Sequence, residues 1–332
     1  MITRRSLTGG LTGAVSAALL PAGLARPAVA QATWPAGRPI EVIVPYPPSG
    51  GIDLMARLLT RHLPSVLQGA TFVVTNRVGA GGQIGNEAIF AARPDGYTLG
   101  AVATLGFIAK ALERPMRWRT EDYVYLANVV DDPGALWVRT DSPLRNAADL
   151  REAASKRVEA VSIGTAAGTS SDDHLLLLAF EAATGVKALH VPYNGTAIAI
   201  RDLLGGQLDV ASYNLSEGIA LLREGRTRCL GQAATSRWSA MADVPTFREQ
   251  GMDVLGGSAR GFVGPPGLPP EIAARLIGAF RTILSDPAFL AEAERLNLPL
   301  RPLLGEEYKA AVLAEAASAK ALYERSPWST QP

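Results

Sequence analysis

The stretch from Val44 to Asp53 reads VPYPPSGGID. It follows a short apolar run, Ile40–Val44, and precedes an amphipathic run, Leu54–Leu63. These runs predict a buried strand and then a helix whose apolar residues are three and four positions apart. The connecting loop contains two prolines, which restrict its backbone, and two glycines, which have no side chain. We therefore expect a rigid, uncluttered loop whose backbone can hold an anion.

The same strand, loop and helix order recurs in the first part of the chain. A second glycine-rich turn, Asn76–Gly82, follows a predicted strand and leads into a predicted helix. This repetition is typical of an α/β domain with a mostly parallel sheet. Further predicted elements here are strands Thr71–Thr75 and Tyr97–Ala103 and helix Gln83–Ala92.

A similar unit recurs later in the chain, opened by a loop of small residues, Gly164–Ser171. We place the crossings between the two units near Asp131–Leu136 and near Gln250–Gly261. The predicted organisation is an export signal at 1–30, one lobe made of 31–132 and 252–332, and an inserted lobe at 133–251. The predicted elements are strands Glu159–Ile163, Leu189–Pro192 and Leu208–Tyr213, and helices Asp172–Thr184, Ile198–Leu204, Ile219–Glu224, Glu271–Ser285, Pro287–Arg295 and Gly305–Arg325.

Each opening loop joins the carboxyl end of a strand to the start of a helix. Ligands of open α/β sheets bind at this edge. The first N–H groups of a helix have no partner within it and carry partial positive charge, which favours an anion. Two such loops facing each other would suit a small molecule with carboxylates at both ends. Ordinary connections packed with small residues are the alternative for either loop alone.

The composition excludes several classes of protein. The 332 residues include 32 Lys and Arg and 31 Asp and Glu, so the basic surplus of a nucleic-acid-binding protein is missing. Cys229 is the only cysteine, so no internal disulfide forms, and its apolar surroundings indicate a small buried residue. His62, His174 and His190 do not have the spacing of metal ligands. We expect neither a metal nor a cofactor.

The first thirty residues have the features of an export signal. Arg4 and Arg5 precede a weakly apolar run from Leu7 to Leu24, and Ala28–Ala30 has the small-residue pattern of a cleavage site. The paired arginines favour the twin-arginine route, with the general secretory route as the alternative. Cleavage near Ala30 would remove three arginines and leave 29 basic and 31 acidic residues. We expect a periplasmic protein.

Several catalytic and nucleotide motifs are incomplete. Gly79–Gly85 resembles a dinucleotide-binding turn, but Ile84 stands where the last glycine is required. Ser170, Asp172 and His174 suggest a hydrolase triad, but residues two apart on a helix do not face each other. Neither a phosphate-binding P-loop nor a G-x-S-x-G motif is present.

Two arginines near the loops have two possible roles. Arg57 and Arg77 could bind a ligand carboxylate, or they could form structural ion pairs with Asp53 or Glu87. We prefer the structural pairs.

Seven motifs, in order, resemble those of a known family. The chain is similar to the extracytoplasmic solute receptors of tripartite tricarboxylate transporters, also called Bug receptors, from about Trp34 to the last helix. The motifs are Val44–Gly50 with Asp53 and Arg57, Asn76–Gly82, Pro94–Thr98, Gly168–Ser170 with His174, His190–Tyr193, Leu203–Val210 and Asp243–Phe247.

This resemblance implies a two-lobed periplasmic-binding-protein fold of type II, which closes on its ligand at a hinge. It also implies that backbone amides, hydroxyls and ordered waters hold a ligand carboxylate between the lobes. The candidate ligand-binding residues are Tyr46, Pro47, Pro48, Ser49, Gly50, Asp53, Gly81, Gly82, Thr104, Ala167, Gly168, Thr169, Ser170, His174, Tyr193, Asn194 and Gly195.

The chain also departs from the family pattern. Ser49 replaces the first glycine of the usual Pro-Pro-Gly-Gly, and Val78 replaces a proline. The loop before His174 is two residues longer than in many members and resembles a subgroup with Ser-Asp-Asp-His. The segment Ala259–Phe262 stands where an aromatic residue is common, and its Arg260 could contact a distal carboxylate. The ligand therefore cannot be carried over from the family.

The sequence predicts a monomeric periplasmic receptor, not an enzyme. It would capture a small organic carboxylate, such as a di- or tricarboxylate, and deliver it to the membrane subunits of a tripartite transporter. Two alternatives remain open: an exported enzyme acting on a carboxylate, and a sensor subunit that presents its ligand to a signalling partner.

Overall fold

The computed structural model describes residues 34–166, 168–325 and 327–328. The predicted export signal and Ala167 lie outside the described residues. No helix in the described ranges is long and apolar enough to cross a membrane.

The opening strand, β1, is the middle of three parallel strands. Its register pairs Val42 with Val74 on one side and with Leu99 on the other. The strand was predicted at the observed bounds, while the helix after it begins three residues earlier than predicted, at Gly51. The elements of this part are β1 (Ile40–Val44), α1 (Gly51–His62), η1 (Leu63–Ser65), β2 (Phe72–Asn76), η2 (Ala80–Gly82), α2 (Gln83–Phe90), β3 (Thr98–Ala103), α3 (Thr104–Glu113) and η3 (Thr120–Asp122).

A second group of parallel strands lies in the middle of the chain. The strand β5 pairs with β6 on one side and with β7 on the other. The predicted bounds of α5 and β6 are confirmed. The elements here are α4 (Ala147–Ser155), β5 (Ser162–Thr165), α5 (Asp172–Thr184), β6 (Leu189–Pro192), α6 (Thr196–Leu204), β7 (Val210–Asn214), α7 (Leu215–Arg223), β8 (Thr227–Gln232) and η4 (Ser239–Met241).

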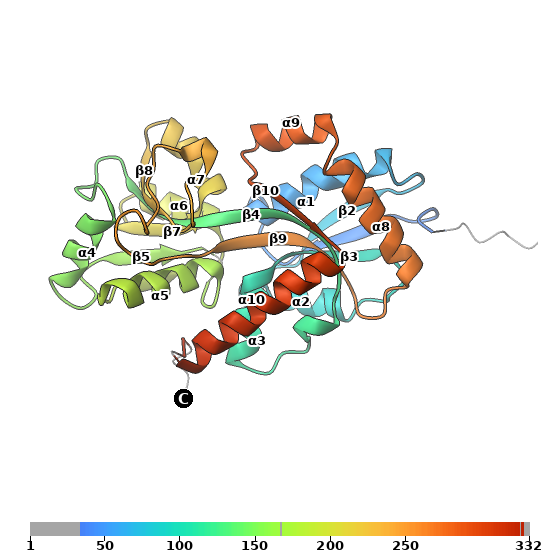
Figure 1. Cartoon of the computed structure of the whole chain (residues 1–332), viewed down its shortest axis with the longest axis horizontal. Helices are drawn as coiled ribbons and strands as arrows, with labels where there is room; N and C mark the ends of the chain where they lie inside the picture. The colour runs from blue at the N-terminus through green and yellow to red at the C-terminus, as the bar shows by residue number, and fades with distance from the viewer. Residues whose placement is uncertain (1–33, 167, 326, 329–332) are drawn as a thin grey trace, which may run out of the picture. The chain divides into compact units, whose positions relative to one another are not determined.

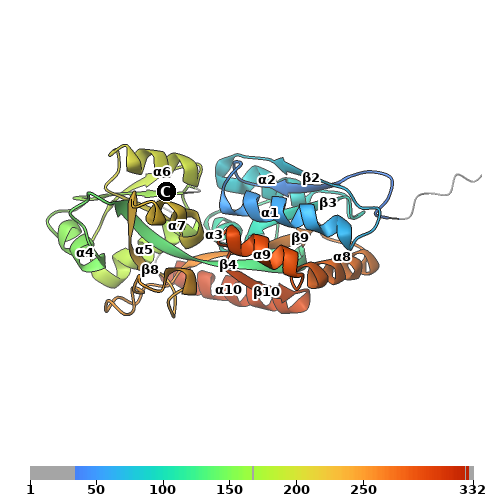
Figure 2. The same ribbon diagram turned by 90° about the horizontal axis from the view of Figure 1, so that it is seen from above.

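Two long strands connect these groups. The strand β4 (Val124–Arg139) pairs with β9 (Gly257–Gly264) as far as Pro133, and from Gly134 onward with β7 and β8. Figures 1 and 2 show β4 and β9 running side by side from one group of strands to the other. The remaining elements are α8 (Pro270–Ile283), α9 (Pro287–Arg295), β10 (Leu300–Leu304) and α10 (Glu306–Arg325).

The prediction of a mostly parallel sheet is wrong. The pairs of β9 with β3 and β4, and those of β4 with β7, β8 and β10, are antiparallel. The physical reason is the double crossing, since one strand leaves the first group and the other returns to it. The strand order is β2-β1-β3-β9-β4-β7-β5-β6, with β8 and β10 also paired to β4.

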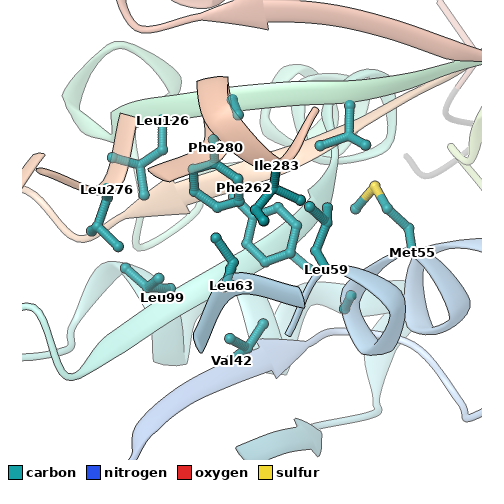
Figure 3. Packing of buried hydrophobic residues seen from close by; sticks show 14 of the residues in the cluster. Val42, Met55, Leu59, Leu63, Leu99, Leu126, Phe262, Leu276, Phe280 and Ile283 are labelled. Atoms are coloured by element: carbon teal, nitrogen blue, oxygen red, sulfur yellow. The ribbon is translucent and has the colours of Figure 1, made fainter. Parts of the chain in front are cut away.

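Each group of strands has its own apolar core. Around β1, the side chains of Val42, Leu59 and Leu99 pack against Phe262 and Phe280, and all five are fully buried (Figure 3). Burying one such side chain contributes about 1.5–3 kcal/mol. A separate core lies between β5, α5 and the end of β4. The loops between these cores form the site described next.

Candidate functional site

The loop from Val44 to Gly51 is held by Asp53. This carboxylate accepts hydrogen bonds from Ser49 N at 3.0 Å, Arg57 Nε at 2.9 Å and Asn76 Nδ2 at 2.9 Å. Burial acts to raise the pKa of Asp53, but these bonds outweigh it and lower the pKa below its ordinary value. The structural pair of Arg57 with Asp53 is therefore confirmed.

Arg77 pairs differently from either prediction. It donates to the Glu41 carboxylate, at 2.9 and 3.1 Å, and not to Asp53 or Glu87. Glu41 lies on β1, next to β2 in the sheet, so the strand pairing brings the two side chains together. Arg77 lines a second pocket together with Glu41 and lies outside the loop site.

Ser49, which replaces the usual glycine, has a positive φ of 70°. Side chains rarely adopt this left-handed region, so a glycine would fit here with less strain. Gly50 then caps α1 without a side-chain acceptor. The first N–H groups of α1 are consequently available to groups outside the loop.

The second glycine turn supports the first loop. A Cβ on Gly82 would lie 3.0 Å from the Tyr46 ring, and Gly82 has a φ of 94°. Only glycine combines this φ with such a close approach of the ring. Gly82 thus allows the turn to pack against Tyr46, which itself lines the cavity described below.

The helices α5, α6 and α7 of the second group of strands all begin at the cavity described below. Ser171 caps α5 and accepts from His174 N, so Asp172 and Asp173 occupy the first turn. Gly195 caps α6 without a side-chain acceptor. Asn214 and Glu217 cap α7 reciprocally.

These helix starts and the first loop enclose one cavity of about 640 Å³, counting its solvent-open mouth. Apolar side chains form part of its wall, and carboxylates and one guanidinium form another part. The lining residues are Tyr46, Pro47, Pro48, Gly50, Gly51, Ile52, Asp53, Ala103, Ala166, Asp172, Asp173, Gly195, Thr196, Ala197, Ile198, Asn214, Glu217, Ser258 and Arg260.

Arg260 reaches the cavity from β9 and is buried. Its Nη1 lies 2.9 Å from Asp132 Oδ2, and its Nη2 donates to Asn214 Oδ1 at 2.6 Å. Burial raises the pKa of Asp132 to about 6, although Arg260 opposes the shift. Among the described residues, Nε and Nη1 of Arg260 have no hydrogen-bond acceptor of suitable geometry.

Glu217 joins the two sides of the cavity. Its Oε1 accepts from Gly51 N and from Thr196 Oγ1, each at 3.0 Å. Its Oε2 lies 3.7 Å from Arg260 Nη2. A carboxylate therefore already occupies the start of α1, where helix geometry favours negative charge.

The predicted ligand-binding residues fall into two sets. Tyr46, Pro47, Pro48, Gly50, Asp53 and Gly195 line the cavity. The other described candidates do not line it: Ser49, Gly81, Gly82, Thr104, Gly168, Thr169, Ser170, His174, Tyr193 and Asn194. The ligand contacts of both sets stay predictions.

Several members of the second set have structural contacts. Ser170 N donates to His174 Nδ1 at 3.0 Å, and the His174 ring stacks on His190 at 4.2 Å between centroids. Burial lowers the pKa of His174 to about 3. Thr169 O accepts from Lys110, and Thr104 donates to Glu315. These contacts tie the α5 loop to α3, and α3 to α10.

The sequence analysis did not name Thr196, Asn214, Glu217, Ser258 or Asp173 as ligand-binding residues, and it considered Asp172 only as a member of an incomplete hydrolase triad. One signal could have indicated Glu217. The run Asn214-Leu215-Ser216-Glu217 has the spacing of a capping box directly after a strand, which places it at the ligand-binding edge. No sequence spacing links Ser258 to the loops.

The part of the chain that the structure covers offers no metal site and no exposed thiol. No cluster of three or more His, Cys, Asp or Glu side chains there could hold a metal ion. Cys229 is buried, as predicted, and burial raises the pKa of its thiol to about 12.

Comparison with known proteins identifies the same family that the sequence motifs resemble. A family model described as "Tripartite tricarboxylate transporter family receptor" matches residues 55–313. Protein BugT of Bordetella pertussis is 34% identical over 259 residues, which are 77% of this chain and 78% of BugT.

Solved structures show the same fold. The periplasmic binding protein BugD is 28% identical, with a TM-score of 0.80, and the match covers 87% of this chain and 97% of BugD. An R. palustris protein with adipate is 27% identical, with a TM-score of 0.81, covering 88% of this chain and 97% of that chain. The predicted two-lobed periplasmic-binding-protein fold is confirmed. The chain belongs to the family of tripartite tricarboxylate transporter receptors, which are solute-binding proteins.

Proposed function

We propose that this protein is a periplasmic receptor that binds a small organic carboxylate and delivers it to the membrane subunits of a tripartite transporter. The observation that carries the proposal is that the starts of α1 and α6, from the two groups of strands, line one cavity, and neither is capped by the side chain of its own N-cap residue. Glu217 accepts from Gly51 N, the first N–H group of α1. Unpaired N–H groups at a helix start bind anions.

Arg260 adds a second reason. Its Nε lacks an acceptor among the described residues, and Arg260 lines the cavity. A guanidinium N–H donates a charge-assisted hydrogen bond to a carboxylate. The similar R. palustris protein, whose structure contains adipate, supports the same ligand class by analogy.

The action proposed is closure, without chemistry. Contacts from both lobes favour the closed state when the ligand is present. The predicted lobe limits, with 133–251 inserted between 31–132 and 252–332, are part of this proposal. The signal pattern at 1–30 supports export to the periplasm, and the family supports the transporter as partner.

The test is thermal unfolding of residues 31–332 against dicarboxylates, tricarboxylates, monocarboxylates and amino acids. A ligand present at a hundred times its Kd adds about 2.7 kcal/mol to the stability. A large shift with a carboxylate that is recovered chemically unchanged supports a receptor. If carboxylates cause no shift, the ligand class is wrong. If the carboxylate is converted, the protein is an enzyme.

A further inference from the structure

The cavity contains more acidic than basic side chains. Asp172, Asp173 and Glu217 line it together with Arg260, and Asp132 lies directly behind Arg260. Asp53 also lines it, but its charge is compensated by Arg57. One guanidinium thus faces four carboxyl groups. Such an arrangement does not by itself favour a second anionic group from a ligand.

The charge of Arg260 is already shared. It pairs with Asp132 at 2.9 Å and with Glu217 at 3.7 Å. Neither Asp172 nor Asp173 forms an ion pair with any side chain in the described ranges. Arg260 attracts both carboxyl groups electrostatically, but its direct ion pairs are with Asp132 and Glu217.

Asp173 is the less satisfied of the two. It is 3% exposed and lines the cavity, and its Oδ1 has no hydrogen-bond partner among the described residues. A buried acceptor without a donor costs about 1–3 kcal/mol. Burial, together with neighbouring Asp172 and Glu217, raises the pKa of Asp173 well above its ordinary value. A donor from a ligand would relieve both conditions.

Part of the cavity wall is apolar, with Pro47, Pro48 and Ile198 among its lining residues. A ligand with a short hydrocarbon body could span from this wall and the helix starts to the Asp172–Asp173 pair. The groups at its two ends would then meet different environments: N–H donors at one end and carboxyl groups at the other.

We propose that Asp172 and Asp173 form a subsite for a protonated nitrogen, so that the ligand is an amino-carboxylate and not a plain di- or tricarboxylate. This inference rests on the proposed function, which supplies the carboxylate end. The ammonium donates to the free Oδ1 of Asp173, and the carboxylate binds near Arg260 at the first-turn N–H groups of α1 and α6 other than Gly51 N, which Glu217 accepts. A second carboxylate at the subsite would be repelled by Asp172 and Asp173.

The test compares ligands of equal length by titration calorimetry on the mature chain near pH 7. One series is succinate, 3-aminopropanoate and aspartate; the other is adipate, 5-aminopentanoate and 2-aminoadipate. Hexanoate and hexylamine report the carboxylate and the ammonium separately. We expect a nitrogen-bearing ligand of at least one series to bind at least tenfold more tightly than its dicarboxylate.

The variant Asp173→Asn keeps the shape of the side chain and cannot take on a negative charge beside an ammonium. It should reduce the preference for the nitrogen-bearing ligand at least tenfold, and Asp172→Asn should act in the same direction. Asp243→Asn is the matched control, because Asp243 is exposed and does not line the cavity. The measurements on the wild-type protein decide the question even if Asp173→Asn fails to fold.

The outcomes separate this inference from the proposed function. If every dicarboxylate binds as tightly as its amino partner, or more tightly, the subsite is wrong and the carboxylate receptor stands. If hexylamine binds and no carboxylate does, the subsite is supported and the carboxylate claim falls. If neither class binds, both are overturned.

Discussion

The Glu217 carboxylate accepts a hydrogen bond from Gly51 N at 3.0 Å, although the two residues are 166 positions apart. Gly51 begins α1, and Glu217 lies in the first turn of α7. One side chain thus completes the caps of two helices that belong to different groups of strands. This contact connects the two sides of the cavity.

Replacement of Glu217 tests this connection. Glu217→Ala leaves Gly51 N and Thr196 Oγ1 without their acceptor and removes half of the α7 capping box. We expect a loss of about 1–3 kcal/mol in the free energy of unfolding, measured by urea titration of the ligand-free protein. Glu224→Ala, at an exposed position after α7, is the control and should have almost no effect. Equal losses in both variants would contradict the interlobe role.

Gly51 is required by the guanidinium beside it. A Cβ at Gly51 would lie 2.0 Å from Arg260 Nη1 and 2.5 Å from its Cζ. Because Asp132 and Asn214 hold the guanidinium, Gly51→Ala should cost about 1–3 kcal/mol in thermal unfolding and weaken ligand binding. Gly278→Ala, inside α8 with nothing within 4 Å, should be neutral or stabilising by about 1 kcal/mol. A harmless Gly51→Ala would show that Arg260 can move away.

Asp53 keeps the opening loop in place. Asp53→Ala removes the acceptor for Ser49 N, Arg57 Nε and Asn76 Nδ2, and should lower the stability by about 2–4 kcal/mol in urea unfolding. Because the folded pKa of Asp53 is lowered, its contribution is present above the ordinary pKa of 3.8 and is lost as the pH falls below it. Asp141→Ala, at an exposed position, should change little. A loss that persists undiminished in strong acid would argue against this account.

Ile198 lies at the cavity and is 41% exposed, so a larger side chain there should block the ligand without disturbing the core. We expect Ile198→Trp to fold normally and to bind at least tenfold more weakly in calorimetry. Ile84→Trp is the matched control, because Ile84 is 54% exposed near the start of α2 and lies outside the cavity. Unchanged affinity in Ile198→Trp would place the ligand elsewhere.

Glu315 should make the stability depend on pH. Burial raises the pKa of its carboxyl to about 7 from an ordinary value of 4.5, although the bond from Thr104 opposes the shift. The folded protein therefore holds this proton more tightly than the unfolded chain does. The resulting stabilisation is fully present below pH 4.5 and is lost as the pH rises through about 7.

Glu315→Gln removes this titration. Urea titrations at several pH values measure the free energy of unfolding of both proteins. Relative to the variant, the wild type should lose stability as the pH rises from about 4.5 to 7. Glu307→Gln, exposed on the same helix, should run parallel to the wild type. A pH-independent difference for Glu315→Gln would mean that the group does not titrate in this window.

Local signals in the sequence determined most of the helices and the parallel strands. Ser171 before Asp172 and Asp173 marks the start of α5, and Asp286 with Pro287 marks the start of α9, because caps and fixed φ angles act over a few residues. The predicted strand Ile40–Val44 matches because its residues other than Glu41 are apolar and buried, as is typical of a strand inside a sheet. The loop held by Asp53 and Arg57 also depends on residues that are only four positions apart in the sequence.

Only the tertiary structure decided how the cavity is built. The strand β4 was missed because Asp131–Gly134 contains two acids, a proline and a glycine, which in isolation indicate a turn. These residues continue the strand because β9 pairs with them and Arg260 compensates the buried Asp132. The hydrogen bond from Gly51 to Glu217 forms only when both groups of strands have folded. The burial of Asp173 Oδ1 without a donor is likewise a result of tertiary packing. Contacts between residues more than a hundred positions apart depend on the packing of whole elements, which no local spacing records.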